Sequence, residues 1–372
     1  MKLKITPYIF FILPVCLMLN PFQSVSAEKT PPVEPGFITL IDSAERIVKI
    51  PEKVERIACL YAFTGHAVTM MGRGKDIVAV SRGLKRDSLL LEICPSIENA
   101  IVPKSQGALN MEEVLNAAPD VLFIPGDMSG NRGEMEKLER LGIPAVIIDY
   151  HDMAGQQEAI NIIGRAVGRP ERAAEYNEYY RKCVDHVKKI TDAVPEEKKI
   201  RLYHSLLEAN RTTLKHGLTA DWLRATGVIN VALSSHMNIL DGKNFVGIEQ
   251  ILVWNPDVIL ANEPEAFKLI LNDRKWALVN AVKNGRVYQM PIAISRWGHP
   301  GSMETPLAVL WTARQLYPDL FKDLDMKKET KRYYKDFFSF RLSDSKAESI
   351  LKGKLIRKPK NEGRKSQDKK QH

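Results

Sequence analysis

Two stretches of the sequence decide how this chain folds: MEEVLNAAPDVLFIP at residues 111–125 and IEQILVWNPDVILAN at residues 248–262. Each places a glutamate and spaced apolar residues before a Pro-Asp step, and an apolar run after it. The proline ends a helix, because the residue before a proline is disfavoured in the helical conformation. The apolar run is typical of a buried strand. The sequence therefore predicts a helix–strand unit that occurs once in each half of the chain.

Further short apolar runs alternate with helical segments around both units, and this alternation predicts parallel sheets. A polar turn between two apolar runs predicts a β-hairpin at the start, residues 37–50. The predicted strands are 56–60, 76–80, 121–124 and 145–149 in the first half, and 201–208, 230–234, 257–261 and 286–290 in the second. The predicted helices outside the two units are 66–71, 134–141, 220–227 and 265–282.

The middle of the chain, residues 154–191, shows no strand signal. One helix is predicted at 157–168 and a second from Pro170 to Ile190, since proline is favoured in the first turn of a helix. Two antiparallel helices and one long strut are both compatible with this pattern. We therefore predict an N-terminal lobe at 28–153, a helical linker at 154–191, a C-terminal lobe at 192–340 and a basic, disordered tail at 341–372.

The first residues are typical of a secretory signal. A basic start, MKLK, precedes an apolar stretch and the small residues Val25-Ser26-Ala27, so we expect residues 1–27 to be removed after Ala27 and the protein to be exported to the periplasm. The short apolar stretch is interrupted by a proline, which argues against a permanent membrane span. A lipid anchor on Cys16 is the alternative, although lipid attachment favours a small residue where Val15 stands.

The net charge of +9 does not describe the folded body. Residues 352–372 hold nine Lys and Arg against two Asp and Glu, and Lys2 and Lys4 supply the remaining excess, so residues 5–351 are neutral. The basic balance is therefore no sign of nucleic-acid binding. A solvated tail is the simple interpretation, and contact with anionic lipid or cell wall is the alternative.

The cysteines predict no disulfide scaffold. Removal of the signal leaves Cys59, Cys94 and Cys183, and an odd number cannot all pair within one chain. Cys59 lies in the apolar run RIACL, where a small buried side chain is expected.

The order of these segments resembles the substrate-binding proteins of bacterial ABC importers for iron–siderophore complexes, haem and cobalamin. The resemblance covers residues 37–340 and is carried by the entry segment 37–60, by GRGKDIVAV at 72–80, by the two repeated units and by SMETPLAVLWTARQLYP at 302–318. It implies an α/β fold of two Rossmann-like lobes with central parallel sheets, joined by one long rigid helix at 170–190, with the ligand cleft between the lobes.

The resemblance also implies a function. We expect a monomeric, non-enzymatic carrier without an intrinsic cofactor, which captures a metal complex and delivers it to an ABC permease and its ATPase. The expected ligand is a ferric siderophore, with haem or a corrinoid such as cobalamin as alternatives. In the relatives one glutamate on each lobe docks onto permease arginines, and Glu112 and Glu249 occupy those places. A favourable position in the first turn of a helix is the alternative explanation for both.

By the same resemblance, five loops line the cleft: 61–66, 81–86, 104–107, 212–219 and 295–302. Their side chains offer flat aromatic faces for a large ring, guanidinium groups for anions, an amide, and imidazoles that suit either metal coordination or hydrogen bonding. The predicted ligand-binding residues are Tyr61, Phe63, His66, Arg82, Arg86, Gln106, His216, Arg296, Trp297 and His299, with His216 and His299 as candidate metal ligands. A lone loop histidine is more often a hydrogen-bonded surface residue, and Arg296 beside Trp297 also suits a surface cation–π pair.

Other functions find less support in the sequence. A metal chelatase shares the two-lobed design, but P-loop, GxSxG and HExxH motifs do not occur. A binder of bare metal ions needs three or four convergent ligands, whereas the histidines are scattered over different loops. A nickel–histidine or similar complex stays open, because one protein imidazole completes such a shell.

Overall fold

The computed structural model describes residues 36–355, except 106–107, 214, 235–237 and 241–242. All of them belong to one compact unit. The predicted signal, the site residue Gln106 and the end of the basic tail lie outside the described residues. Within the described part, every helix is too short or too polar to cross a membrane.

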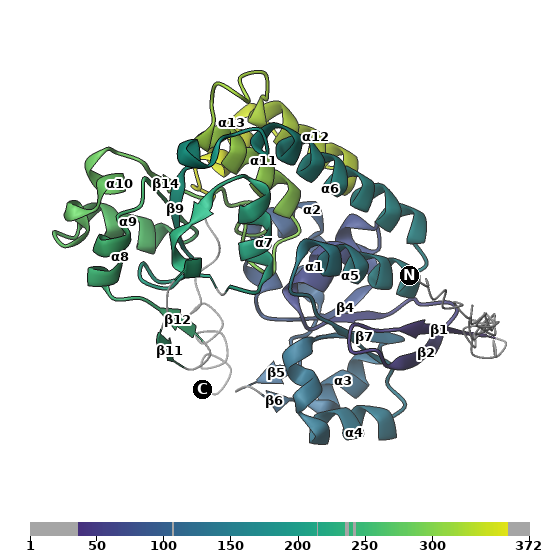
Figure 1. The fold of residues 1–372 in the computed structure, drawn as a ribbon. Coiled ribbons are helices and arrows are strands. Elements are labelled where there is room, and N and C mark those ends of the chain that lie inside the picture. Colours follow the sequence, from purple (N-terminus) through teal and green to yellow (C-terminus); the bar gives the residue numbers. More distant parts are fainter. Residues whose placement is uncertain (1–35, 106–107, 214, 235–237, 241–242, 356–372) are drawn as a thin grey trace, which may run out of the picture. The chain divides into compact units, whose positions relative to one another are not determined.

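Each lobe contains a four-stranded sheet whose neighbouring strands are all parallel (Figure 1). The strand orders are β4-β3-β7-β8 and β10-β9-β13-β14, so both lobes add their strands in the same sequence. The predicted architecture is therefore confirmed. The first sheet comprises β3 (Ile57–Cys59), β4 (Ile77–Val80), β7 (Val121–Pro125) and β8 (Ala145–Ile148), and the second β9 (Arg201–Ser205), β10 (Ile229–Asn230), β13 (Val258–Ala261) and β14 (Val287–Gln289).

The helix–strand unit that the sequence repeats has the same backbone conformation in both lobes. Helices α3 (Met111–Ala117) and α8 (Ile248–Trp254) both end on a left-handed residue, Ala118 with φ 40° and Asn255 with φ 43°. A proline follows each, and the next residue is the aspartate. The chain therefore turns sharply from helix to strand at the same point of the unit.

The two aspartates accept hydrogen bonds from the backbone at the start of the first strand of each sheet, β3 or β9. The Asp120 carboxylate accepts the backbone N–H of Arg56 at 2.8 Å, and the Asp257 carboxylate accepts that of Arg201 at 3.0 Å. The side chains of the same two arginines bond the ends of the helices. Arg56 donates to the Ala117 carbonyl of α3 at 2.6 Å, and Arg201 donates to the corresponding carbonyl of α8 at 2.7 Å. Carbonyls at a helix C-terminus lack intrahelical donors, so each arginine satisfies one.

Two sequence-predicted elements differ from the structure. Of the strand predicted at 230–234, only Asn230 pairs with β9, in a strand that begins at Ile229, and residues 231–234 form a 3₁₀ turn. The long helix predicted at 265–282 is broken into α9 (Pro264–Asn272), a 3₁₀ turn at 276–278 and α10 (Asn280–Lys283). Asp273 at the end of α9 takes an extended conformation, φ −81° and ψ 129°, which breaks the helix.

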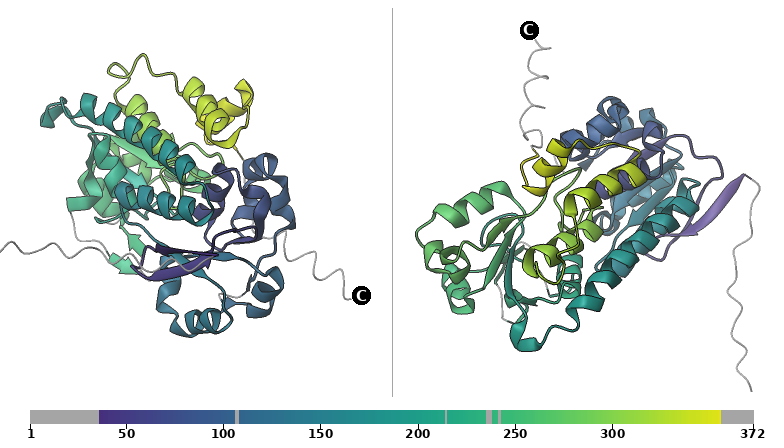
Figure 2. Two further views of the ribbon diagram at one scale, coloured as in Figure 1. Left: turned by 90° about the vertical axis from the view of Figure 1, so that its right-hand side faces the viewer. Right: turned by 90° about the horizontal axis from the view of Figure 1, so that it is seen from above.

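The linker consists of two helices, α5 (Met153–Ala166) and α6 (Pro170–Thr191), and α6 is the predicted linking helix. Helices α11 (Thr305–Leu316) and α12 (Met326–Phe338) lie beside it (Figure 2). One cluster of buried side chains includes Ile57 of β3, Tyr176 of α6, Leu307 of α11 and Leu202 of β9. The lobes thus share a close-packed helical layer, which resists bending of α6.

The tail predicted from residue 341 begins later. Residues Asp344–Leu351 form helix α13, in which Ala347 and Ile350 are fully buried. Lys346 of this helix forms an ion pair with Glu92 of the N-terminal lobe. The boundary at 341 is therefore wrong, because the apolar face of α13 completes the body of the protein.

The remaining elements decorate this frame. The predicted entry hairpin is confirmed as β1 (Phe37–Ile41) paired with β2 (Ile47–Pro51). Cys59, Cys94 and Cys183 are buried free thiols, and burial raises the pKa of Cys59 to about 12. The other elements are α1 (Ala62–Met70), α2 (Ser88–Ile93), α4 (Arg132–Arg140) and α7 (Leu218–Ala225), and the small hairpins β5 (Lys104–Ser105) with β6 (Ala108–Leu109) and β11 (Asn238–Leu240) with β12 (Lys243–Phe245).

Candidate ligand-binding site

Residues 294–304 connect β14 to α11, and side chains from other elements hold the backbone carbonyls of this loop. Trp297 O accepts from Asn262 Nδ2 at 2.5 Å, Gly298 O from Trp222 Nε1 at 3.1 Å, Pro300 O from Tyr150 OH at 2.9 Å, Ser302 O from Gln156 Nε2 at 3.0 Å and Met303 O from Tyr333 OH at 3.1 Å. Elements of both lobes and of the helical layer thus fix one loop. A loop fixed in this way provides the preorganised support that a binding site requires.

Tyrosines of the N-terminal lobe meet this loop across the cleft. The hydroxyl groups of Tyr61 and Tyr150 lie 3.0 Å apart, and Tyr150 donates to the carbonyl of Pro300. Burial raises the pKa of Tyr61 to about 12 and raises that of Tyr150 well above its usual value. Both phenols are therefore neutral at physiological pH and act as hydrogen-bond donors and acceptors rather than as anions.

A narrow pocket of about 230 Å³ lies beside this contact. Its walls come from the segment after β8 in the N-terminal lobe and from the loops after β9 and β14 in the C-terminal lobe, so it lies outside the carboxyl ends of parallel strands, where ligands of such sheets bind. The lining residues are Tyr150, His151, Leu206, Arg211, Thr212, Thr213, His216, Gly217, Leu218, Thr219, Asn244 and Pro300.

Three hydroxyl groups in the lining of this narrow pocket already donate to backbone carbonyls, namely those of Tyr150, Thr212 and Thr219, so the donors that it offers to a ligand are chiefly imidazole and guanidinium groups. Hydroxyl, amide, imidazole and guanidinium groups face it, and acidic side chains are missing from its described lining. Two carboxylates lie next to these groups: Glu208 is 3.5 Å from Arg211, and Asp149 is 3.6 Å from His151. The arrangement is suited to an anion, which accepts several hydrogen bonds at once.

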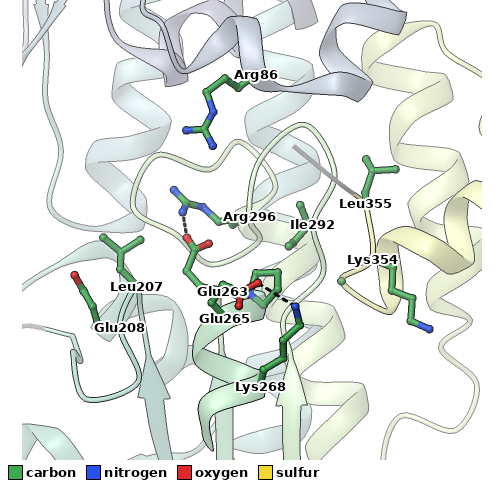
Figure 3. Close-up of a pocket in the computed structure, with 12 residues that line it drawn as sticks. Arg86, Leu207, Glu208, Glu263, Glu265, Lys268, Ile292, Arg296, Lys354 and Leu355 are labelled. Atoms are coloured by element: carbon green, nitrogen blue, oxygen red, sulfur yellow. Dashed lines mark hydrogen bonds and ion pairs between the residues drawn. The ribbon is translucent and has the colours of Figure 1, made fainter. Parts of the chain in front are cut away.

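A wider pocket of about 820 Å³ opens on the other side of the same two C-terminal loops. Figure 3 shows Arg86 reaching from the N-terminal lobe toward Arg296, which is paired with Glu263. Lys268 pairs with Glu265 at 3.0 Å on the floor. Mixed charges line this pocket, so its preference for anions is weaker than that of the narrow one.

Three of the sequence-predicted site residues are buried instead of facing the cleft. Trp297 and Phe63 are fully buried, and His66 is 2 % exposed. The expectation that these side chains contact the ligand is corrected by their burial. Helix α1 begins at residue 62, before the predicted start at 66, and every residue from 63 to 70 in it is buried, which accounts for Phe63 and His66. His66 bonds Asp87 at 3.0 Å, and Phe63 packs its ring against Tyr150 with 4.8 Å between centroids.

The ring of Trp297 serves the core beneath the site. It belongs to the same buried cluster as Leu307 of α11, so it cannot stack on a ligand in this structure. The nearby residue Gly298 has φ 74°, a left-handed conformation that turns the chain after Trp297. This turn sends the tryptophan inward and brings Pro300 to the pocket.

Some of the remaining predicted residues lie at the cleft. His216 is exposed and lines the narrow pocket, Arg86 and Arg296 line the wide one, and Arg82 is exposed on the loop after β4. His299 is half-buried, and its Nδ1 accepts the N–H of Gly301 at 3.2 Å. An imidazole that accepts through Nδ1 carries its proton on Nε2 when neutral, which suits hydrogen-bond donation better than metal coordination.

Metal coordination by His216 or His299 stays a prediction. Across the residues that the structure describes, no group of three or more His, Cys, Asp and Glu side chains gathers as a metal site would require. A metal ion bound here within a complex would therefore take most of its ligands from that complex.

Several pocket residues were missed from the sequence. Tyr150 follows the predicted strand 145–149 directly, a position at which parallel sheets place ligand contacts, so this signal was present. Arg211 and Asn244 had no such signal, because their approach to the pocket depends on the bond from the Thr212 N–H to the Asn244 carbonyl at 3.0 Å, which joins distant segments.

The two predicted docking glutamates occupy equivalent places on the lobes. Glu112 and Glu249 are both exposed and both lie in the first turn of their helices, α3 and α8. Their contact with a permease stays a prediction, and the favourable interaction of a carboxylate with the helix N-terminus holds independently of it.

Two facing α/β lobes, a helical linker and a donor-lined cleft define a class of protein that captures solutes. A model of the periplasmic binding protein family matches residues 69–293, and the chain belongs to that family. It is a substrate-binding protein of an ABC importer, a non-enzymatic solute carrier that acts outside the cytoplasm together with a permease and its ATPase.

Known proteins that resemble this chain agree with this assignment. The molybdate-binding protein MolA of Haemophilus influenzae is 26 % identical over 333 residues, which cover 80 % of this chain and 90 % of the relative. A periplasmic solute binding protein of Veillonella parvula is 26 % identical with a TM-score of 0.73, and the match covers 85 % of this chain and 97 % of that structure. CeuE of Helicobacter pylori with bound Ni(II), 23 % identical with a TM-score of 0.69, covers 84 % and 99 % respectively and shares the fold.

Proposed function

We propose that this protein captures a compact metal-containing anion, a tetrahedral oxyanion of the molybdate class, in the narrow pocket between its lobes. The observation that carries the proposal is the lining of that pocket, which offers donors from both lobes and no carboxylate among its described residues. Burying an anion is costly unless it is fully hydrogen-bonded. A pocket rich in donors meets this requirement.

The size of the pocket supports the same ligand class. Its volume of about 230 Å³ falls below the range of roughly 300–1,000 Å³ that is usual for sites of drug-sized ligands. A siderophore or a haem exceeds it, whereas a tetrahedral oxyanion fits. The molybdate-binding relative from Haemophilus influenzae supports the proposal as a likeness between the chains.

A larger anionic chelate is the second candidate, and the wide pocket favours it. That pocket holds about 820 Å³ and has the guanidinium groups of Arg86 and Arg296 at its walls. Such a volume suits the ferric siderophore expected from the sequence, or a haem or corrinoid. The acidic residues Glu208, Glu263 and Glu265 in the same lining weigh against a strongly anionic ligand there.

Calorimetry on the full chain distinguishes the two candidates. Molybdate and tungstate are titrated in parallel with sulfate, a ferric siderophore, haemin and cobalamin. We expect the metal oxyanions to bind, and at a hundred times the dissociation constant the bound ion adds about 2.7 kcal/mol to the free energy of unfolding. Binding of the ferric siderophore alone would favour the second candidate and refute the first.

His216→Ala tests the location of the site, with His186→Ala as the matched control. His216 lines the narrow pocket, whereas His186 lies on α6 beside Phe321. Loss of one hydrogen bond to a charged ligand costs about 1.5–3 kcal/mol, so the oxyanion should dissociate at least tenfold more readily from His216→Ala and as before from His186→Ala. Equal affinities in the two variants would place the anion elsewhere.

A further inference from the structure

Glu304 is a fully buried carboxylate behind the loop that faces the cleft. It lies at the N-cap of α11, where the helix dipole favours a negative charge. Its Oε2 accepts the Ser295 N–H at 3.1 Å and also the Ser295 hydroxyl, while its Oε1 accepts the Tyr334 hydroxyl. The Ser302 hydroxyl lies 3.5 Å from Oε2. The groups around the carboxyl therefore donate to it, as an ionised acid requires.

The titratable groups near Glu304 are His66 of α1, Tyr176 of α6, and Tyr333 and Tyr334 of α12. Tyr334 belongs to α12, while Ser295 and Trp297 belong to the loop itself, and His66 of α1 acts on Glu304 through its electrostatic field. Burial is the largest influence and raises the pKa of Glu304, whereas the hydrogen bonds from Ser295 and Tyr334 oppose that rise. Lysine and arginine do not appear among the principal influences, so hydroxyl and amide donors carry the stabilisation.

The donors of Glu304 come from both ends of one loop. Ser295 and Ser302 bracket the residues that reach the two pockets, Arg296 and Pro300. The Ser295 and Ser302 hydroxyl oxygens lie 2.7 Å apart, and the Glu304 N–H donates to Ser302 Oγ at 3.0 Å. The carboxylate thus closes the base of the loop, and removal of its charge leaves several buried donors without an acceptor.

The same base is tied to the linker between the lobes. Gln156 of α5 donates to the Ser302 carbonyl and accepts the hydroxyl of Tyr180 of α6 at 2.8 Å. Tyr176 of α6 donates to the Met303 carbonyl. The loop is therefore fixed relative to the linking helix and not only to its own lobe.

We propose that Glu304 is a positioning residue of the binding site: its carboxylate holds residues 295–302 in the conformation that receives the ligand. The inference rests on the proposed function for the identity of the ligand, but not for the positioning itself. Glu304 does not contact the ligand, and it affects affinity through Arg296, His299 and Pro300.

Glu304→Gln tests the proposal, because glutamine keeps the size of the side chain but replaces one acceptor oxygen with a donor that faces other donors. Tyr334→Phe removes a hydroxyl that donates to Glu304 and accepts the Ile294 N–H at 3.3 Å, but it leaves the carboxylate, so it serves if the first variant does not fold. Tyr179→Phe is the matched control, since it removes a tyrosine hydroxyl that donates to another glutamate, Glu329, at 2.8 Å and away from the loop.

Two readouts are measured: amide hydrogen exchange of peptides that cover residues 294–303, and the affinity for molybdate. We expect exchange in this loop to accelerate at least tenfold in Glu304→Gln, and less in Tyr334→Phe, with a parallel weakening of molybdate binding. Tyr179→Phe should leave both unchanged. Loop exchange and affinity equal to those of the unaltered protein in the glutamate variant, or uniform acceleration over the whole chain, would overturn the proposal.

The two proposals fail separately. If the unaltered protein binds no oxyanion, the proposed function is wrong, while hydrogen exchange still reports whether Glu304 positions the loop. If molybdate binds but exchange in the loop does not respond to Glu304→Gln, only the positioning role is wrong.

Discussion

Gly298→Ala should disturb both the stability of the protein and its binding site, because Gly298 is constrained twice. Its φ of 74° lies in the left-handed region, which costs roughly 1–2 kcal/mol for a residue with a side chain. A Cβ at this position would also lie 2.5 Å from Cζ2 of Trp222 and 3.2 Å from Cε of Met290. Trp222 is fully buried and cannot retreat, and overpacking of this kind costs about 1–3 kcal/mol more.

Gly72→Ala provides the matched control for this substitution. Gly72 has φ 76°, almost the same backbone conformation, but no atom lies within 4 Å of the place that a Cβ would take. Only the conformational cost applies, so we expect a loss of about 1–2 kcal/mol. The sum for Gly298→Ala is about 2–5 kcal/mol, and the difference between the two variants isolates the steric contribution of the Trp222 wall.

Urea denaturation followed by circular dichroism measures both losses, and calorimetry with molybdate measures the effect on the site. The Gly298 carbonyl accepts the Trp222 indole N–H at 3.1 Å, so displacement of the chain here also moves the loop that carries Pro300. We expect weaker oxyanion binding in Gly298→Ala and unchanged binding in Gly72→Ala. Equal losses of stability in the two variants would refute the idea that Trp222 is too rigid to make room for a Cβ at position 298. Unchanged binding in both variants would show that the loop tolerates displacement.

Three further predictions concern buried charge, the repeated unit and docking. Burial lowers the pKa of His204 to about 4 from its usual 6.5. As the pH falls, the unfolded chain therefore binds a proton at this histidine before the folded protein does, and the folded state should lose about 3 kcal/mol of stability between pH 6.5 and pH 4. Urea denaturation should detect this loss in the unaltered protein and not in His204→Gln. Asp120→Asn and Asp257→Asn should each lower the free energy of unfolding by about 1–2 kcal/mol, and the two losses should add in the double variant because the sites lie in different lobes. A clear departure from additivity in urea denaturation would contradict their independence. Glu112→Ala with Glu249→Ala should weaken binding to the permease in nanodiscs without changing ligand affinity, whereas Glu113→Ala, also exposed on α3, should change neither; weaker ligand binding would show that the two glutamates are misplaced.

The sequence predicts the frame well, because the frame rests on local signals. Pro-Asp steps after apolar helices fix the positions of α3, β7, α8 and β13. The start of α1 was less visible. All residues from Phe63 to Met70 are buried, so the helix shows no alternation of polar and apolar faces, and the sequence predicts it only from residue 66 and assigns Phe63 to a loop.

The orientation of side chains within the binding loop was not predictable from local sequence. The breaks at Gly298 and Pro300 correctly indicated a loop, but the direction of Trp297 depends on bonds from Asn262 and Trp222, which lie more than thirty residues away. A tryptophan in a loop suits a cleft or a core equally well by its chemistry. The hydrogen bonds from these distant residues place the Trp297 side chain in the core.

The repeated frame also explains why the pocket lies where it does. Strands β3 and β9 hold the same place in their sheets, as do β8 and β14. The cleft is built after these same strands: Tyr61 follows β3, the segment with Arg211 and His216 follows β9, Tyr150 follows β8, and the loop with Pro300 follows β14. The bond between Tyr150 and Pro300 therefore joins the two segments that follow equivalent strands of the lobes.

Two consequences follow from this equivalence. The frame places the same four loops at the cleft whatever their sequences are, so a substitution in them changes the ligand without changing the fold. The anchoring of these loops is unequal, however, since the loop after β14 is bonded to α5, α6 and α12 through Gln156, Tyr176 and Tyr333. Selectivity should therefore change most readily in the exposed segment around His216, while the loop after β14 supplies the fixed side against which a ligand is held.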